Sequence, residues 1–275
     1  MEKKDTSLIS MTVDRFMADT CMSHAAALSF YVVLSVIPLL FVLISVGSYI
    51  VGSTSSFFPY ILSILKQFIP DISPAVIHDV GNLLQNRGAI GVLGFIFLLF
   101  SSDLALLEAK RSLDVIFRLE KRRNPLFIKG KSMLVIVAGG IVVSFLFIIT
   151  PIFKVLIKLD LPLISTTLYI IAQIFSSRLF AFFMIFLLFT AAYYFLPSKR
   201  IDRKYIFIAG GITTILWTVV RVLFSWYLAH RSRINIVYGS LAAIIITILW
   251  VYYTSLIFLL SAEFVSSLKE KTERN

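Results

Sequence analysis

The sequence predicts an all-α integral membrane protein, with a bundle of six transmembrane helices in a single domain over residues 1–275. Composition is the first of three reasons. Hydrophobic residues make up 59% of the chain, charged residues 15%, and the mean hydropathy is +0.92. A typical soluble domain has roughly 45–50% apolar and about 25% charged residues. The other two reasons are long uncharged stretches and an uneven distribution of Lys and Arg between them.

Each predicted span is an apolar run close to the length of about 20 residues that a helix needs to cross the bilayer core. The runs are continuous rather than alternating, which favours helices over a closed β-barrel. Charges interrupt them rarely: Asp103 lies in the second run and Arg221 in the fifth. In chain order, the predicted spans are Ala25–Val51, Gly88–Leu107, Ser132–Phe153, Leu179–Pro197, Tyr205–Ala229 and Ile234–Ala262.

The distribution of positive charge predicts the orientation. With six spans and the N-terminus inside, 18 of the 26 Lys and Arg residues fall in cytoplasmic segments and seven in outer loops. This bias is the positive-inside rule, and it places both termini in the cytoplasm. A seventh apolar run, Leu161–Ser177, would reverse the bias if it crossed the membrane. We interpret it as an interfacial helix on the outer face, an extension of the fourth span or part of a re-entrant loop.

Amphipathic interfacial helices are predicted beside the spans. Met1–Thr20 has the pattern of a cytoplasmic amphipathic leader, with no cleavable signal peptide evident. Apolar residues at helical spacing in the first outer loop, 52–87, predict two short helices that cap the bundle or cover a cavity. The segment Glu108–Lys131 carries eight Lys and Arg residues and predicts a basic helix on the inner leaflet.

Several classes of function are excluded or disfavoured. The +11 net charge lies in short loops beside spans, where anionic lipids supply the counter-charge, so we expect membrane lipids as partners and no nucleic acid. Cys21 is the only cysteine, which excludes a disulfide scaffold. The three histidines are dispersed, and no HExxH, CxxC, Walker A or GxSxG motif is present. We therefore expect no catalytic residues, no metal, no cofactor and no enzymatic activity.

Ionisable residues inside a bilayer are costly, and each is a candidate functional residue. Asp103 is predicted in the inner third of its span and Arg221 in the outer third, so the two should not pair. Glu263 ends the sixth span near the inner face. Asp103, Glu108 and Glu263 form either an acidic inner vestibule or ion pairs with Lys110, Arg111 or the basic cluster at Lys199–Lys204. Snorkelling at the interface is the simpler reading for all three acids.

Aromatic and kink-forming residues complete the candidate set. Pro38 lies in the middle of the first span and should kink it, with Tyr31 two turns earlier. Trp250 is predicted near the bilayer midplane, at a depth similar to that of Pro38. Such residues either line a substrate path or fill space between helices.

Two motifs resemble the YihY/virulence factor BrkB family over nearly the whole chain. The first is Ala25-Ala26-Ala27-Leu28-Ser29-Phe30-Tyr31 followed by Ser35-Val36-Ile37-Pro38. The second is Tyr238-Gly239-Ser240-Leu241-Ala242, then Leu249-Trp250-Val251-Tyr252-Tyr253 and Ser261-Ala262-Glu263, where Ser261 replaces the family's more frequent glycine. We add Tyr238 and Gly239 to the candidate functional residues, because the segment Tyr238–Glu263, which we expect to form the functional core with the first span, begins with them at the outer face.

The resemblance implies a multi-pass protein of the bacterial cytoplasmic membrane without a settled activity. Some members have been labelled as a tRNA-processing ribonuclease, but this sequence lacks the His/Asp metal cluster that such an enzyme requires. The leading hypothesis is a transporter-like protein for a lipid or amphipathic solute. The alternative is a non-transporting structural or interaction protein of the cell envelope. A groove lined by Tyr31, Pro38, Asp103 and Trp250 would favour the first. The sequence alone does not give the substrate, energy source, direction or oligomeric state.

Overall fold

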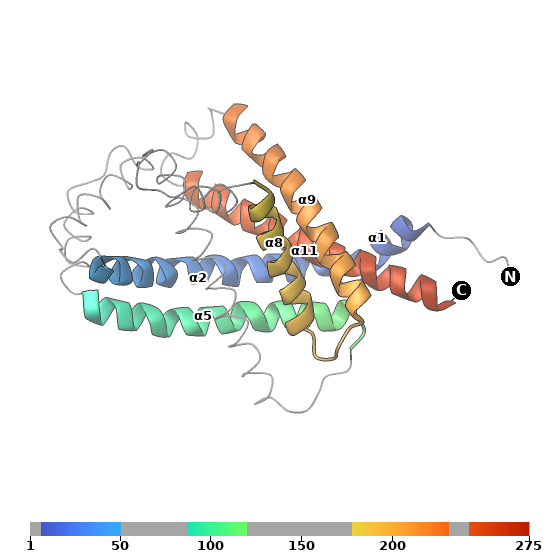
Figure 1. The fold of residues 1–275 in the computed structure, drawn as a ribbon, viewed down its shortest axis with the longest axis horizontal. Coiled ribbons are helices and arrows are strands. Elements are labelled where there is room, and N and C mark those ends of the chain that lie inside the picture. The colour runs from blue at the N-terminus through green and yellow to red at the C-terminus, as the bar shows by residue number, and fades with distance from the viewer. Residues whose placement is uncertain (1–6, 51–86, 120–177, 231–241, 275) are drawn as a thin grey trace, which may run out of the picture. The chain divides into compact units, whose positions relative to one another are not determined.

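The structure is a computed structural model, and it describes residues 7–50, 87–119, 178–230 and 242–274. Every regular element in these ranges is a helix, which confirms the all-α prediction for the part of the chain described (Figure 1). The described helices are α1 (Leu8–Ala18), α2 (Cys21–Ile50), α5 (Arg87–Ile116), α8 (Arg178–Phe195), α9 (Arg203–His230) and α11 (Ala242–Arg274).

Three stretches in the described ranges are long and apolar enough to cross a membrane: Gly91–Ile116, Arg203–Tyr227 and Ile245–Glu273. A fourth is possible if α1 and the first part of α2 form one bent span. The predicted span at 132–153, the Leu161–Ser177 segment and most of the outer loop at 52–87 lie outside the described residues. The number of six spans therefore stays a prediction.

Two helices extend well beyond the predicted ends of their spans. The second span was expected to end at Leu107, before a separate basic helix, but α5 continues without a break to Ile116. The sixth was expected to end at Ala262, but α11 continues to Arg274. The extensions are held by packing, because Leu113, Ile116 and Val265 in these turns are fully buried. A surface helix along the inner leaflet would leave such side chains exposed.

Helix α1 is amphipathic and meets α2 at a sharp bend. Its first turn is capped by Ser7, whose hydroxyl accepts a hydrogen bond from the backbone N–H of Ser10 at 3.2 Å. Thr12 and Phe16 are buried, while an apolar stripe on another side is exposed. The axis turns by 63° between α1 and α2. The exposed stripe consists of Ile9, Val13 and Met17.

The chain divides into two compact units, and four of the helices pass from one to the other. Unit 1 comprises Met1–Ala25, Leu106–Tyr227 and Thr254–Asn275. Unit 2 comprises Ala26–Ala105 and Leu228–Tyr253.

The core of unit 1 is built around α8, the first half of α9 and the middle of α11. Tyr193 on α8 is fully buried, and its ring stacks on Phe258 of α11 with centroids 4.6 Å apart. Its hydroxyl donates a 2.6 Å hydrogen bond to the Phe258 carbonyl and shares a second, at 2.7 Å, with the Thr213 hydroxyl of α9. One tyrosine thus connects three helices.

Glycine permits a close helix crossing in each unit. In unit 1, a Cβ on Gly210 of α9 would lie 3.1 Å from the Cβ of Thr190 on α8. In unit 2, a Cβ on Gly94 of α5 would lie 2.8 Å from the Phe41 Cβ and 3.3 Å from the Pro38 carbonyl oxygen on α2. These contacts leave no room for a larger residue, so α5 packs directly against α2 beside its internal proline.

Candidate functional site

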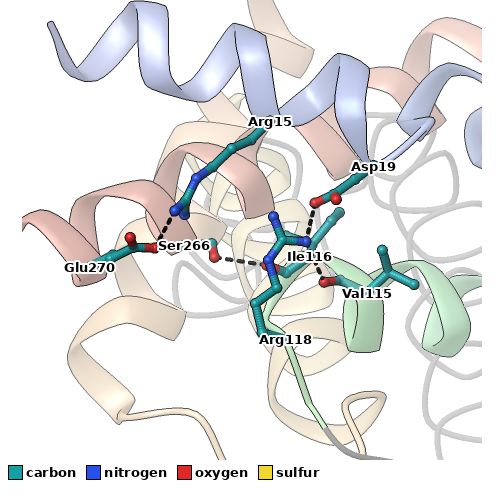
Figure 2. Close-up of polar contacts among 7 residues, drawn as sticks. All are labelled: Arg15, Asp19, Val115, Ile116, Arg118, Ser266 and Glu270. Atoms are coloured by element: carbon teal, nitrogen blue, oxygen red, sulfur yellow. Dashed lines mark hydrogen bonds and ion pairs between the residues drawn. The ribbon is translucent and has the colours of Figure 1, made fainter. Parts of the chain in front are cut away.

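A group of five charged residues in unit 1 is the strongest candidate for a functional site, and we call it the ionic cluster. It joins three separate segments of the chain through ion pairs (Figure 2). Arg15 of α1 pairs with Glu270 of α11, and Asp19 at the end of α1 pairs with Arg118 just after α5. The cluster comprises Arg15, Asp19, Arg118, Glu263 and Glu270.

The local backbone around the Asp19–Arg118 pair is unusual. Thr20, next to Asp19, has a φ of 50°, and Arg118 itself has a φ of 54°. Residues other than glycine seldom adopt this left-handed conformation, and a β-branched threonine does so least readily. The surroundings must therefore hold both residues in place. Such strain is typical of sites where a contact has to be positioned.

Hydrogen bonds fix the end of α5 within the ionic cluster. The Arg118 guanidinium donates to the Asp19 carboxylate at 2.5 Å and to the Val115 carbonyl at 3.1 Å. The Ser266 hydroxyl of α11 donates to the Ile116 carbonyl at 2.8 Å. Because the last carbonyls of a helix have no partner within it, these donors satisfy groups that burial would otherwise leave unpaired (Figure 2).

Glu263 is the most deeply buried member of the ionic cluster. Its exposed fraction is 0%, and neither carboxyl oxygen has a hydrogen-bond partner among the described residues. The charges of Asp19, Arg118 and Arg15 act on it electrostatically. Ser267, one turn along the same face of α11, is also fully buried, and its hydroxyl has no hydrogen-bond partner in the described ranges.

A second polar network lies on α5. The Lys110 ammonium contacts the Asp114 carboxylate at 3.0 Å and the Ser198 hydroxyl at 2.6 Å. Asp114 also accepts hydrogen bonds from the Ser198 backbone N–H at 2.7 Å and from its hydroxyl at 2.5 Å. Asp114 thus anchors the segment after α8 to α5, as a satisfied structural contact.

Two of the residues expected near the inner face, Glu108 and Lys110, have ion-pair partners in unit 1. Glu108 lies 2.7 Å from His24 Nδ1 and 3.9 Å from the Arg111 guanidinium, so it forms one of the expected pairs. Lys110 pairs with Asp114 rather than with Glu108 or Glu263. Asp103 belongs to unit 2, where it is half-buried.

The other predicted residues are divided between the units. Unit 2 contains Tyr31, Pro38 and Trp250 together with Asp103, so the four residues proposed to line one path share a unit. Arg221 belongs to unit 1, where its guanidinium lies 5.6 Å from the centre of the Trp217 ring, a cation–π contact. Tyr238 and Gly239 lie outside the described residues.

Sequence reasoning missed Arg15, Asp19, Arg118 and Glu270 as site residues. Each lies outside the predicted spans, where a charge is ordinary and carries no signal of its own. A signal did exist in α1: an 11-residue helix with two buried positions on one face must pack against something.

The described residues contain no group of three or more His, Cys, Asp or Glu side chains that could hold a metal ion. The chemistry that the ionic cluster can perform is the exchange of partners between two arginines and three acids.

Comparisons with known proteins agree on one family of membrane proteins. The family model described as "Virulence factor BrkB" matches residues 12–275. A UPF0761 membrane protein of Vibrio vulnificus is 26% identical over 270 residues, covering 96% of this chain and 83% of the relative. One from Aliivibrio salmonicida is 26% identical over 267 residues, covering 94% and 82%.

A third relative, the ribonuclease-like protein YfkH of Bacillus subtilis, is 23% identical over 283 residues, covering 98% of this chain and 97% of the relative. No solved structure matches the chain significantly. The family match over nearly the whole sequence and the membrane-protein relatives agree with the apolar helices described above. The chain therefore belongs to the virulence factor BrkB family of membrane proteins.

Proposed function

We propose that this protein is transporter-like and moves a lipid or another amphipathic solute across the bacterial cytoplasmic membrane, with both termini in the cytoplasm. The observation that carries the proposal is the ionic cluster, which includes the fully buried Glu263. Ionisable groups buried in membrane proteins mark substrate paths and relays, because their cost is retained only where a function needs them.

The form of the ionic cluster supports a moving part rather than a rigid anchor. Two ion pairs join α1, the end of α5 and α11, and each is made by side chains of the kind that exchange partners when helices shift. Breaking the pairs would free α1 from α11 without disrupting the apolar core around Tyr193. We therefore propose the ionic cluster as a gate and the four predicted residues of unit 2 as candidates for the path.

The surfaces available support an amphipathic solute. The first half of α5 exposes a nearly continuous apolar face, and the only charge in the helix between Gly88 and Leu107 is Asp103. Such a surface suits acyl chains and offers few partners for an ion. The exposed apolar residues are Val92, Leu93, Phe95, Ile96, Phe97 and Phe100.

Reconstitution tests the proposal directly. Purified protein in vesicles that contain a fluorescently labelled phospholipid should increase the fraction of label reached by an impermeant quencher added outside. Native mass spectrometry of gently extracted protein should show a bound lipid. Label movement equal to that of protein-free vesicles, together with no co-purified lipid or solute, would contradict transport.

Labelling of single cysteines tests the orientation. Arg111 is well exposed, with 62% of its side chain accessible. In a background with Cys21→Ala, Arg111→Cys should react with an impermeant thiol reagent only after the cells are opened. Labelling from outside intact cells would contradict a cytoplasmic end of α5.

The alternative is a non-transporting structural or interaction protein. The network of Tyr193, Thr213 and the Phe258 carbonyl favours it, as does the Lys110–Asp114–Ser198 network, because the polar groups of both are paired with one another. This alternative predicts unchanged lipid movement but a co-purified protein partner.

We also propose that the protein is not an enzyme. Degradation of tRNA by the purified protein, abolished by a chelator, would contradict this.

A further inference from the structure

Glu263 combines burial with a second carboxyl group beside it, that of Asp19. Its side chain is fully buried, and neither oxygen has a hydrogen-bond partner in the residues described. An ionised carboxylate in this position would be deprived of water without compensation, a cost of several kcal/mol. Buried acids avoid this cost by taking up a proton or by recruiting a cation.

Within the ionic cluster, both cations are already engaged by other acids in this arrangement. Its two cations, Arg15 and Arg118, are each paired with another acid, Glu270 and Asp19. With a neutral Glu263 the five side chains carry no net charge. With an ionised Glu263 they carry one buried negative charge, beside the carboxylate of Asp19 that already acts on it.

We infer that Glu263 is a proton-binding site, and that its protonation state decides whether Arg15 and Arg118 remain paired with Glu270 and Asp19. A proton from water forms an O–H bond with one carboxyl oxygen, and the resulting neutral acid leaves both ion pairs intact. Loss of that proton to water leaves a carboxylate that repels Asp19 and attracts both arginines. The Arg118 guanidinium then leaves Asp19 for Glu263, and the end of α1 separates from the end of α5, while Arg15 stays paired with an acid on α11.

The groups around Glu263 favour a proton over a metal ion. Arg15 and Asp19 face it from α1, and Arg118 from the end of α5. Cys21 at the start of α2 is buried and senses its charge. The titratable residue of α8 that contacts α11 is Tyr193, and its hydroxyl is already hydrogen-bonded to the Thr213 hydroxyl and the Phe258 carbonyl. Two guanidinium groups beside the carboxyl group of Glu263 repel a metal cation, but they do not prevent the carboxyl group from binding a proton.

This inference deepens the proposed function, because it names the proton as the ligand that would drive the gate. Its biological role rests on the proposed transport. Proton binding and helix movement are nevertheless measurable in the absence of any transported solute. A protein that moves no lipid can still show the titration, and a protein that moves lipid can lack it. The two proposals can therefore fail separately.

Infrared difference spectroscopy of the full-length protein in lipid nanodiscs tests proton binding. A pH titration should reveal the carbonyl-stretch band of one protonated carboxylic acid that disappears as the pH rises. The band should shift when glutamate is labelled with ¹³C, and it should be lost completely in Glu263→Gln. Glu273→Gln is the matched control, because that acid is on the same helix but 64% exposed, and it should keep the band.

Distance measurement tests the switch. Spin labels at Ser10→Cys on α1 and at the exposed Arg111→Cys on α5, with Cys21→Ala, should give one short distance at low pH and a longer, broader distribution at high pH. Glu263→Gln should give the short distance at every pH.

An infrared carbonyl band that persists in Glu263→Gln, or the absence of this band from the wild type at every pH, would overturn the proton site. A change driven by Na⁺ at constant pH would also overturn it, and distances independent of pH would overturn the switch.

Discussion

The Asp19 carboxylate accepts a 2.5 Å hydrogen bond from the Arg118 guanidinium, and each residue lies where the backbone leaves a helix. Asp19 follows α1 and precedes Thr20, whose φ is positive, while Arg118 follows α5 and has a positive φ itself. Two helix ends that are 99 residues apart in the sequence are thus joined by one contact. The pair fixes the position of the turn between α1 and α2 relative to the end of α5.

A double-mutant cycle measures the strength of this pair. Asp19→Asn and Arg118→Gln should each lower the stability of the purified protein by about 1 kcal/mol, because Arg118 is half-exposed and solvent weakens the pair. The double variant should lose less than the sum. Thermal unfolding in detergent is the measurement.

The Lys269–Glu273 pair is the matched control, since its atoms are 3.7 Å apart and Glu273 is exposed. Lys269→Gln and Glu273→Gln should have small, additive effects. Equal coupling in the two cycles would show that the Asp19–Arg118 contact has no special role.

Tyr193→Phe should destabilise the protein by about 1–3 kcal/mol, the cost of removing a hydrogen-bonding group from a buried position. The change removes the donor to the Phe258 carbonyl and the partner of the Thr213 hydroxyl but preserves the stacked ring. Tyr194→Phe is the neighbouring control, because that side chain is 40% exposed, and it should have little effect. Thermal unfolding of the two variants in the same detergent makes the comparison, and equal melting temperatures would refute the three-helix connection.

Gly210→Ala should destabilise the crossing of α8 and α9 by about 1–3 kcal/mol through overpacking. The added methyl group would collide with the hydroxyl and Cβ of Thr190, and the further change Thr190→Ala should restore part of the loss. Gly211→Ala is a sharp control, because the nearest atom to its added methyl group, on Phe186, is 4.0 Å away. Circular dichroism melts of the wild type and the three variants make the comparison. Equal losses for the two glycines would show that the crossing is looser than described.

Asp103→Asn tests whether the charge in the second span serves transport. The change preserves shape and hydrogen bonding, and we expect label movement in vesicles to fall about tenfold, as for a loss of about 1.4 kcal/mol of stabilisation in the transition state. Asp14→Asn, at an exposed position on α1, should leave the rate unchanged. Transport at the wild-type rate by Asp103→Asn would leave only a packing role for this residue.

Composition and apolar periodicity were sufficient for the class of protein. An apolar fraction of 59% with long uncharged runs can only be buried in lipid, and in lipid the backbone must pair within helices. The helices at 21–50, 178–195 and 203–230 accordingly begin and end within a few residues of the predicted spans. The family resemblance carried by the two end motifs was confirmed over residues 12–275.

Only the tertiary structure decided which charges meet. Hydropathy ends a span where charged residues begin, so it could not foresee that α5 and α11 continue into a buried core beyond Leu107 and Ala262. The ionic cluster comes from three segments that are far apart in the sequence: Arg15 and Asp19 at α1, Arg118 after α5, and Glu263 and Glu270 on α11. A charge outside a span has no distinctive pattern, and its role depends on the side chain that packing brings to face it.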